Sequence, residues 1–253
     1  MAILFTMFFM GMILGFAGTG GSGFIIGLLV AVFHIPIHTA LGTSIAAMIF
    51  TTLSGSISHF KEGNALLKTG LSIGIFGALG AYGGTYVARW IDGSHLVWMT
   101  SGMLLLSGFL IWLRTRLSFA GRSESAFEER SVTDRPGFWS KSSMTGIVTG
   151  GLSGMFGIGS TPFIQLALLI LFRLPLRQSV GTTMVVILPI ALCGSAGFLQ
   201  AGFLDWTLLL QVVTGTMTGS YIGAKFTKRA PRVLLRTAMV VTPIAGGLLL
   251  LVR

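Results

Sequence analysis

The sequence has little charge and a single cysteine. Only 9% of its 253 residues are charged, whereas a soluble globular domain carries about 25%. Positions 1–60 contain no Asp, Glu, Lys or Arg, and several later stretches also lack them. This scarcity excludes a large soluble domain. The lone Cys193 excludes a disulfide framework and a cysteine-based metal site.

Long apolar runs take the place of the missing charge. Apolar residues make up 53% of the chain, and the mean hydropathy is +0.86. A helix that crosses a bilayer needs about 20 apolar residues, and the alternating pattern of a membrane β-barrel is absent. The sequence therefore predicts an all-α integral membrane protein. The ten predicted segments are 1–17, 22–33, 38–58, 66–88, 95–113, 141–156, 160–172, 177–199, 204–226 and 232–252.

The net charge of +10 lies between the apolar segments. No solvated basic face exists for nucleic acid, and no carboxylate lies deep in a segment, which argues against a cation transporter. Metal transport needs clusters of Cys, His or carboxylates. No nucleophile and base stand at a recognisable spacing, as catalysis requires. We therefore predict no catalytic residue, no metal and no cofactor; the expected partners are a small anion and the lipid bilayer.

An internal repeat relates the two halves of the chain through a constant offset in residue number. Positions 36–44 read PIHTALGTS and positions 175–183 read PLRQSVGTT, and 175 − 36 = 139. We predict a first transmembrane repeat at 1–113, a polar cytoplasmic linker at 114–140 and a second repeat at 141–253. The same offset relates Gly55 to Gly194, Gly63 to Gly202, Gly80 to Gly219, Tyr82 to Tyr221 and Gly84 to Gly223.

The number of crossings decides how the repeats are oriented. Five segments in each half make the repeats inverted, and four make them parallel. With five, alternate loops collect most of the Lys and Arg, which favours the inverted arrangement, both termini outside and the linker in the cytoplasm. The parallel arrangement stays open if the short segments do not cross.

The second segment of each half is unusually short. The apolar runs within 22–33 and 160–172 have about 11 residues each, or roughly 16 Å of helix, which is about half of a hydrocarbon core. A glycine-rich run precedes each one. We predict broken or re-entrant helices. Counted from Gly18 and Gly154 to the matched prolines, the first entrance is three residues shorter (36 − 18 = 18 against 175 − 154 = 21).

These paired helix starts predict an anion site near the bilayer midplane. A helix start presents free N–H groups and a partial positive charge, so it binds an anion without a cationic side chain. The alternative is close packing of helices through small residues. The predicted substrate-binding residues are Gly20, Gly21, Ser22, Gly23, Thr43, Ser44, Gly159, Ser160, Thr161, Gln165, Thr182 and Thr183.

Two further sets of polar side chains have competing interpretations. The hydroxyls at 43–44 and 182–183 either line the site or bond back to carbonyls of their own helix. His34 and His38 are candidates for proton coupling, since histidine titrates near neutral pH. The alternative for both histidines is an interfacial position at a helix end.

The glycine-rich entrances, the stretch from Pro36 to Ser44, its echo from Pro175 to Thr183 and the later paired glycines resemble the TauE/SafE family of membrane permeases. The resemblance covers nearly the whole chain outside the linker. It implies transport of sulfite, sulfonates and related organosulfur anions. Its motifs are specific for the family and uninformative about the substrate.

Together these observations predict a secondary transporter in the plasma (inner) membrane of a bacterium. We expect it to export a small sulfur oxyanion, such as sulfite or a sulfonate, by alternating access. The alternatives are a permease for carboxylates or other small anions, an anion channel and, last, a membrane enzyme.

Overall fold

Helices build the part of the chain that the computed structural model describes, which comprises residues 2–17, 22–61, 63, 65–117, 132–134, 136–158, 160–227 and 232–252. Within these ranges no strand forms, which confirms the all-α prediction. The candidate site residues Gly20, Gly21 and Gly159 lie outside the described residues. So does most of the predicted linker.

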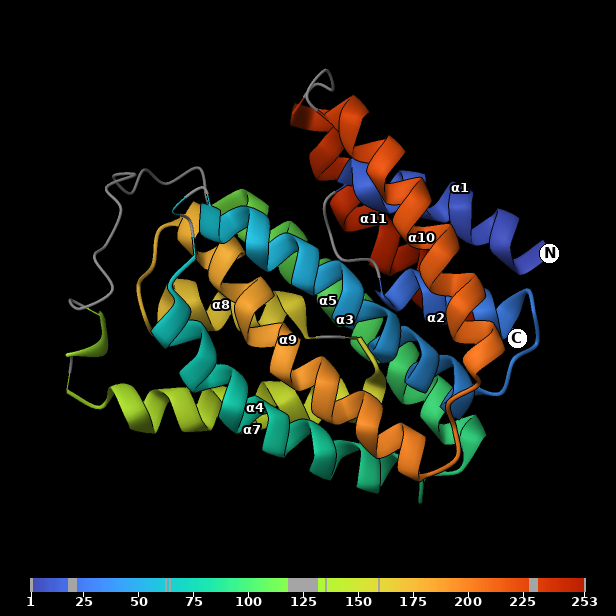
Figure 1. The fold of residues 1–253 in the computed structure, drawn as a ribbon, viewed down its shortest axis with the longest axis horizontal. Helices are drawn as coiled ribbons and strands as arrows, with labels where there is room; N and C mark the ends of the chain where they lie inside the picture. The colour runs from blue at the N-terminus through green and yellow to red at the C-terminus, as the bar shows by residue number, and fades with distance from the viewer. Residues whose placement is uncertain are drawn as a thin grey trace.

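Each half contributes five helices to the described part of the fold (Figure 1). The first half contains α1 (Ala2–Ala17), α2 (Ser22–Ala31), α3 (Ile37–Lys61), α4 (Leu67–Ala88) and α5 (Gly93–Leu117). The second half contains α7 (Phe138–Phe156), α8 (Thr161–Ile170), α9 (Leu176–Gln200), α10 (Trp206–Thr227) and α11 (Arg232–Leu251).

The helix bounds repeat with the offset found in the sequence. The starts of α2 and α8 give 161 − 22 = 139 and their ends give 170 − 31 = 139, and the same holds for α3 with α9 and for α4 with α10. α1 and α7 end at Ala17 and Phe156, again with this offset. The two entrances therefore have equal length, and the predicted three-residue difference is wrong. Gly154 is not an entrance residue, because it lies within α7.

The turns after the helices follow the repeat as well. His34 and Arg173 are equivalent positions of the two halves, and both adopt a left-handed backbone with φ of 53° and 56°. Gly63 and Gly202, another equivalent pair, have φ of 70° and 76°. A left-handed residue ends a helix, so α2 and α8 stop two residues before the predicted limits of 33 and 172.

The linker is shorter than predicted. α5 continues to Leu117 and α7 begins at Phe138, so helix covers both ends of the expected 114–140 segment. The predicted boundary at Arg114 lies where the apolar run ends and charged residues begin. Arginine and leucine are good helix formers, so the helix continues beyond its apolar span.

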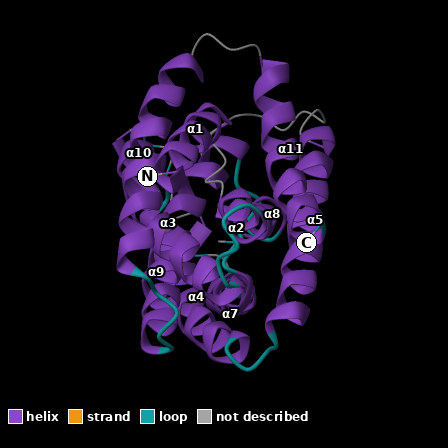
Figure 2. Ribbon diagram, turned by 90° about the vertical axis from the view of Figure 1, so that its right-hand side faces the viewer, coloured by secondary structure: helices purple, strands orange, loops and turns teal. Residues whose placement is uncertain are grey.

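The two halves interlock. α1 of the first half packs along α10 of the second, and α7 of the second half packs along α4 of the first. Figure 2 shows α2 and α8 in the middle, with α5 and α11 on one side and α3, α9 and α10 on the other. Most residues of α2 are buried, whereas α8 is buried at Pro162, Ile164, Gln165 and Leu168 and exposed at Ile170.

Glycines allow these helix pairs to approach closely. A Cβ on Gly150 of α7 would lie 2.0 Å from the carbonyl oxygen of Gly77 in α4, and a Cβ on Gly219 of α10 would lie 2.0 Å from that of Phe8 in α1. Gly80 and Gly84 meet the backbone of α7 in the same way. Gly80, Gly84 and Gly219, which belong to the repeated glycines, therefore serve helix packing.

Several helices are long and apolar enough to cross a bilayer. Among the described residues these are Ile37–Lys61, Leu67–Ala88, Gly93–Leu113 and Gln178–Gln200. α2 and α8 have 10 residues each, about 15 Å of helix. The exposed tryptophans suit the interface between lipid and water. They include Trp90, Trp98, Trp139 and Trp206, which lie near helix ends.

Candidate functional site

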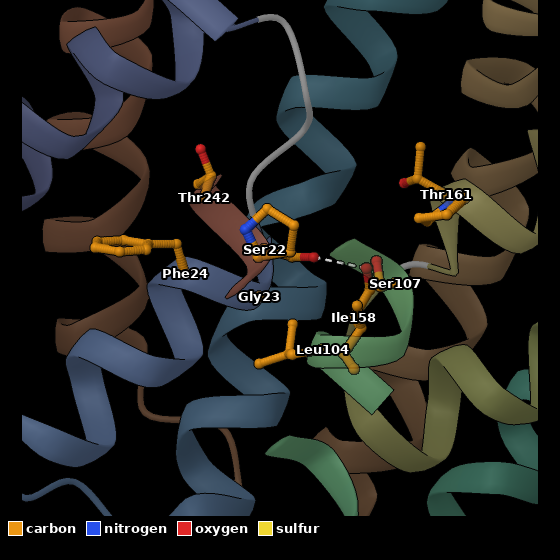
Figure 3. Close-up of a pocket in the computed structure, with 10 residues that line it drawn as sticks. Ser22, Gly23, Phe24, Leu104, Ser107, Ile158, Thr161 and Thr242 are labelled. Atoms are coloured by element: carbon orange, nitrogen blue, oxygen red, sulfur yellow. Dashed lines mark hydrogen bonds between the residues drawn. The ribbon is translucent and has the colours of Figure 1, made fainter. Parts of the chain in front are cut away.

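A small cavity separates the starts of α2 and α8. Its volume is about 40 Å³, which exceeds the space that one water molecule requires. Figure 3 shows Ser22 at the start of α2 and Thr161 at the start of α8 on opposite sides of it. The lining residues are Ser22, Gly23, Phe24, Leu104, Ser107, Ile158, Thr161, Pro162, Thr242 and Pro243.

The cavity lies on the boundary between the repeats. Three pairs among its lining residues are equivalent positions of the two halves, related by the offset of the repeat. The pairs are Ser22 with Thr161, Gly23 with Pro162, and Leu104 with Pro243. Thus α2 and α5 of the first half face their counterparts α8 and α11 of the second.

Ser22 joins the two halves at the edge of this cavity. Its Oγ donates a hydrogen bond of 2.7 Å to the carbonyl oxygen of Ile158, which precedes α8 (Figure 3). Its own carbonyl oxygen accepts a 3.0 Å hydrogen bond from Ser44 Oγ of α3. All three bonded groups are buried, so the start of α2 is held from two sides.

The two helix starts offer different numbers of donors. The first N–H groups of a helix have no partner within it. In α8 the second position is Pro162, which has no N–H, whereas the equivalent residue of α2 is Gly23. A side chain on Gly23 would collide with Leu104, whose Cδ2 lies 2.0 Å from the point that a Cβ would occupy. The start of α2 therefore carries one more backbone N–H than the start of α8.

The lining is mostly apolar, with a few hydroxyl groups and no charge. Ser22, Ser107, Thr161 and Thr242 contribute hydroxyl groups, and no lining residue carries a formal charge. Hydroxyls and helix N-termini stabilise an anion through dipoles. This arrangement suits a small anion better than a cation.

The remaining hydroxyls of the first half surround the site without lining it. Ser44 reaches the cavity only through its bond to the Ser22 carbonyl. Thr43 is fully buried, and its Oγ1 has no hydrogen-bond partner among the described residues.

Apart from Thr161, the described second-half candidates are also set back from the cavity. Thr182 Oγ1 accepts a 3.1 Å hydrogen bond from the N–H of Leu66, and Thr183 Oγ1 donates to Ser179 within its own helix at 2.7 Å. The carbonyl of Gln165 accepts a 3.2 Å bond from Ser179 Oγ. Ser160 is buried immediately before α8, with a left-handed backbone and no side-chain cap to the helix.

The two candidate histidines lie at helix ends. His34 is exposed and occupies the left-handed turn after α2. His38 is half-buried; its Nε2 lies 3.1 Å from the carbonyl oxygen of Ala88, and its ring stacks on Phe203 with centroids 4.8 Å apart. Neither lines the cavity.

Sequence reasoning missed the lining residues of α5 and α11. Leu104 and Ser107 come from α5, and Thr242 and Pro243 from α11. Two signals were present: Thr242 and Pro243 are a polar residue and a proline within an apolar run, and 243 − 104 = 139 extends the repeat to these helices.

The fold and the uncharged cavity between two half-length helices define a multi-pass membrane transporter built from two repeats. Comparison with known proteins gives the family. The model of the sulfite exporter TauE/SafE family matches residues 3–250, and the chain belongs to this family. The protein is thus a transporter of the inner membrane.

Curated relatives carry the same general description. The chain is 47% identical over 251 residues to a probable membrane transporter protein, YdhB, of Bacillus subtilis (strain 168), covering 99% of this chain and 100% of the relative. A probable membrane transporter protein of Xylella fastidiosa (strain 9a5c) is 29% identical over 220 residues, with 87% and 81% covered. No solved structure matches the chain.

Proposed function

We propose that this transporter exports a small sulfur oxyanion, sulfite or a short sulfonate, through the cavity between α2 and α8. The observation that carries the proposal is the pair of equivalent helix starts, Ser22 and Thr161, facing one cavity without a charged side chain. The family description, sulfite exporter, supports the substrate class.

The size and chemistry of the cavity agree with this substrate. The cavity has room for a small ligand, since its volume of about 40 Å³ exceeds that needed by one water molecule. The N–H groups at the start of α2 would bind the oxyanion, with the hydroxyls of Ser107 and Thr161 as further donors. Among the predicted residues, Gly23, Ser22 and Thr161 contact the anion in this proposal, and Ser44 supports the start of α2.

Transport would proceed by alternating access between the interlocked halves. The Ser22–Ile158 hydrogen bond crosses the repeat boundary, so movement of one half against the other must break it. Inverted orientation of the repeats, with the linker in the cytoplasm, is part of this proposal. An inside-negative potential favours outward movement of a monovalent anion by about 2.3 kcal/mol per 100 mV, and export then needs no coupled ion.

Reconstitution in liposomes tests the proposal. We expect sulfite flux that follows an imposed membrane potential, saturates, shows counterflow, and is inhibited by short sulfonates more strongly than by carboxylates. Flux that requires a pH gradient would instead assign proton coupling to His34 or His38. Stronger inhibition by carboxylates would identify a carboxylate permease, and flux without saturation or counterflow would identify an anion channel.

The Ser107→Ala variant links the flux to the cavity. Ser107 is buried and lines the cavity, and the substitution removes one donor with little change in volume. We expect the apparent KM for sulfite to rise about tenfold, the equivalent of one lost hydrogen bond to a charged group. Unchanged flux and KM would reject this cavity as the substrate site.

A further inference from the structure

A second polar hollow lies where α4 and α9 end, and it shares no residue with the cavity between the repeats. Its volume is about 20 Å³. Its floor forms where α4 and α9 approach closely, because a Cβ on Gly197 would lie 2.1 Å from Thr85 Oγ1. The lining residues are Tyr82, Thr85, Tyr86, Arg89, Gly197 and Gln200.

Arg89 provides an exposed cation at the rim of this hollow. Its guanidinium carbon lies 3.7 Å from the centroid of the Tyr86 ring and 5.5 Å from that of Trp90. Stacking on aromatic faces orients the planar group. The edge of the guanidinium, with its N–H groups, is left to bind an anion in a bidentate manner.

No carboxylate in the described part of the chain forms an ion pair with Arg89. The nearest acid in sequence, Asp92, accepts hydrogen bonds from the N–H and the hydroxyl of Ser94, which lower its pKa. Asp205, which follows the end of α9, accepts from the N–H of Leu208 at 3.0 Å. Both carboxylates are engaged at the starts of other helices, so the guanidinium edge of Arg89 is open to an external anion.

Gln200 adds a second oriented donor. Tyr82 donates a 2.6 Å hydrogen bond to Oε1 of Gln200, which directs the amide group and leaves its NH₂ end to donate. The side chain of Tyr82 belongs to α4 and that of Gln200 to α9. The two helix ends thus present an amide and a guanidinium at one hollow.

The surface that leads to this hollow is apolar and faces lipid. On α4 the exposed residues recur every three or four positions and so form one continuous face. Leu192 and Leu199 extend this apolar surface on the adjacent helix α9. The exposed face of α4 includes Leu71, Ile75, Leu79, Tyr82 and Tyr86, and Trp90 continues it just after the helix.

We infer that the hollow binds the phosphate headgroup of an anionic phospholipid, with the acyl chains lying along the exposed faces of α4 and α9. The guanidinium of Arg89 and the amide of Gln200 contact the phosphate oxygens. Tyr86 and Trp90 mark the depth of the interface, where aromatic side chains gather. A soluble anion would not contact the apolar face of α4 and α9, whereas the acyl chains of a lipid would. A lipid therefore fits this surface better than a soluble anion. The inference is independent of the substrate proposed above.

Native mass spectrometry of the purified protein with added lipid tests this site. We expect phosphatidylglycerol to be retained about tenfold more than phosphatidylcholine. Arg89→Gln abolishes this preference, and Gln200→Leu reduces it. The control, Arg173→Gln, removes an exposed arginine in the turn after α8 and leaves the preference unchanged.

A thermal-unfolding series distinguishes lipid from free anion. We expect phosphatidylglycerol to raise the unfolding temperature of the wild type but not of Arg89→Gln, while inorganic phosphate has no effect on either. Stabilisation of the wild type by inorganic phosphate alone would show a solute site and overturn the inference. Equal retention of phosphatidylglycerol by the wild type and by Arg89→Gln would overturn it as well.

Discussion

The two repeats share their helices but not their polar contacts. Ser44 of α3 donates to the carbonyl of Ser22 in the neighbouring short helix at 3.0 Å. The equivalent residue of α9, Thr183, donates to Ser179 one turn earlier in its own helix at 2.7 Å. The hydroxyl bond from α3 therefore supports the start of α2, whereas the hydroxyl bond from α9 to α8, from Ser179, reaches the carbonyl of Gln165 one turn beyond the start of α8.

A second difference concerns the starts of α4 and α10. Asp205 caps α10 by accepting from the N–H of Leu208 at 3.0 Å. The equivalent residue before α4 is Leu66, whose side chain has no atom that can accept a hydrogen bond from the helix start. The N–H of Leu66 donates to Oγ1 of Thr182 in α9. Thr43, the counterpart of Thr182, has no such donor and stays without a described partner. Equivalent polar residues of the two halves therefore have different hydrogen-bond partners, although the helices of the two halves match in their bounds.

The largest expected effect comes from the glycine contacts, where the halves are alike. Gly150→Ala and Gly219→Ala each place a methyl group 2.0 Å from a backbone oxygen of the partner helix. We expect each to lower the free energy of unfolding by about 3 kcal/mol or more, measured by thermal or denaturant unfolding in detergent.

Gly83→Ala is the matched control, because a Cβ there meets nothing within 4 Å. It should leave stability unchanged or raise it by about 0.5–1 kcal/mol. A large loss from only one of the two glycine variants would show that the contacts at Gly150 and Gly219 do not contribute equally to stability.

Next comes the pair at the cavity. Ser22→Ala removes the bond to Ile158 and should cost about 1–3 kcal/mol of unfolding free energy and reduce sulfite flux. Thr161→Val, its counterpart, should reduce flux with a stability change within about 0.5 kcal/mol. Unfolding and liposome flux are measured on both. Equal losses of stability in the two variants would contradict the inference that Ser22 stabilises the fold more than Thr161 does.

Substitution of Thr182 and Thr43 compares a hydroxyl that has a hydrogen-bond partner with one that has none among the described residues. Thr182→Val leaves the buried N–H of Leu66 without a partner, at a cost of about 1–2 kcal/mol, whereas Thr43→Val removes an unpaired group and should be neutral or stabilising. Urea titrations of the two variants check this. The double variant also tests whether these threonines line the transport path, since unchanged sulfite flux and affinity would end that hypothesis.

The smallest effect is expected along α7. Thr145 is buried and its hydroxyl has no described partner, whereas Thr6, its counterpart in α1, bonds back to the carbonyl of Ala2 at 2.9 Å. Thr145→Val should raise stability slightly and Thr6→Val should lower it, each by less than about 0.5 kcal/mol. Unfolding temperatures measured side by side would reveal the sign, and a destabilised Thr145→Val variant would mean that this hydroxyl has a partner.

Much of the fold could be read from the sequence. Missing charge predicted the membrane helices, and the constant offset between the halves predicted the paired short helices α2 and α8. Gly154 was misassigned because a glycine run marks both flexible turns and tight helix contacts, and only the approach of α4 to α7 distinguishes them. The inverted orientation of the repeats, the linker in the cytoplasm and the sulfur substrate stay predictions.

The candidate site was predictable only where the chain itself marks it. Ser22, Gly23 and Thr161 stand at helix starts, a local signal, and the cavity includes them. Leu104, Ser107, Thr242 and Pro243 became lining residues because α5 and α11 pack against those starts, which no local pattern shows. Apolar length and repetition follow from composition along the chain, so the sequence by itself determined the helices, the duplication and the membrane location. Which hydroxyl finds a partner depends on distances between helices far apart in the chain, and only the tertiary structure decided that.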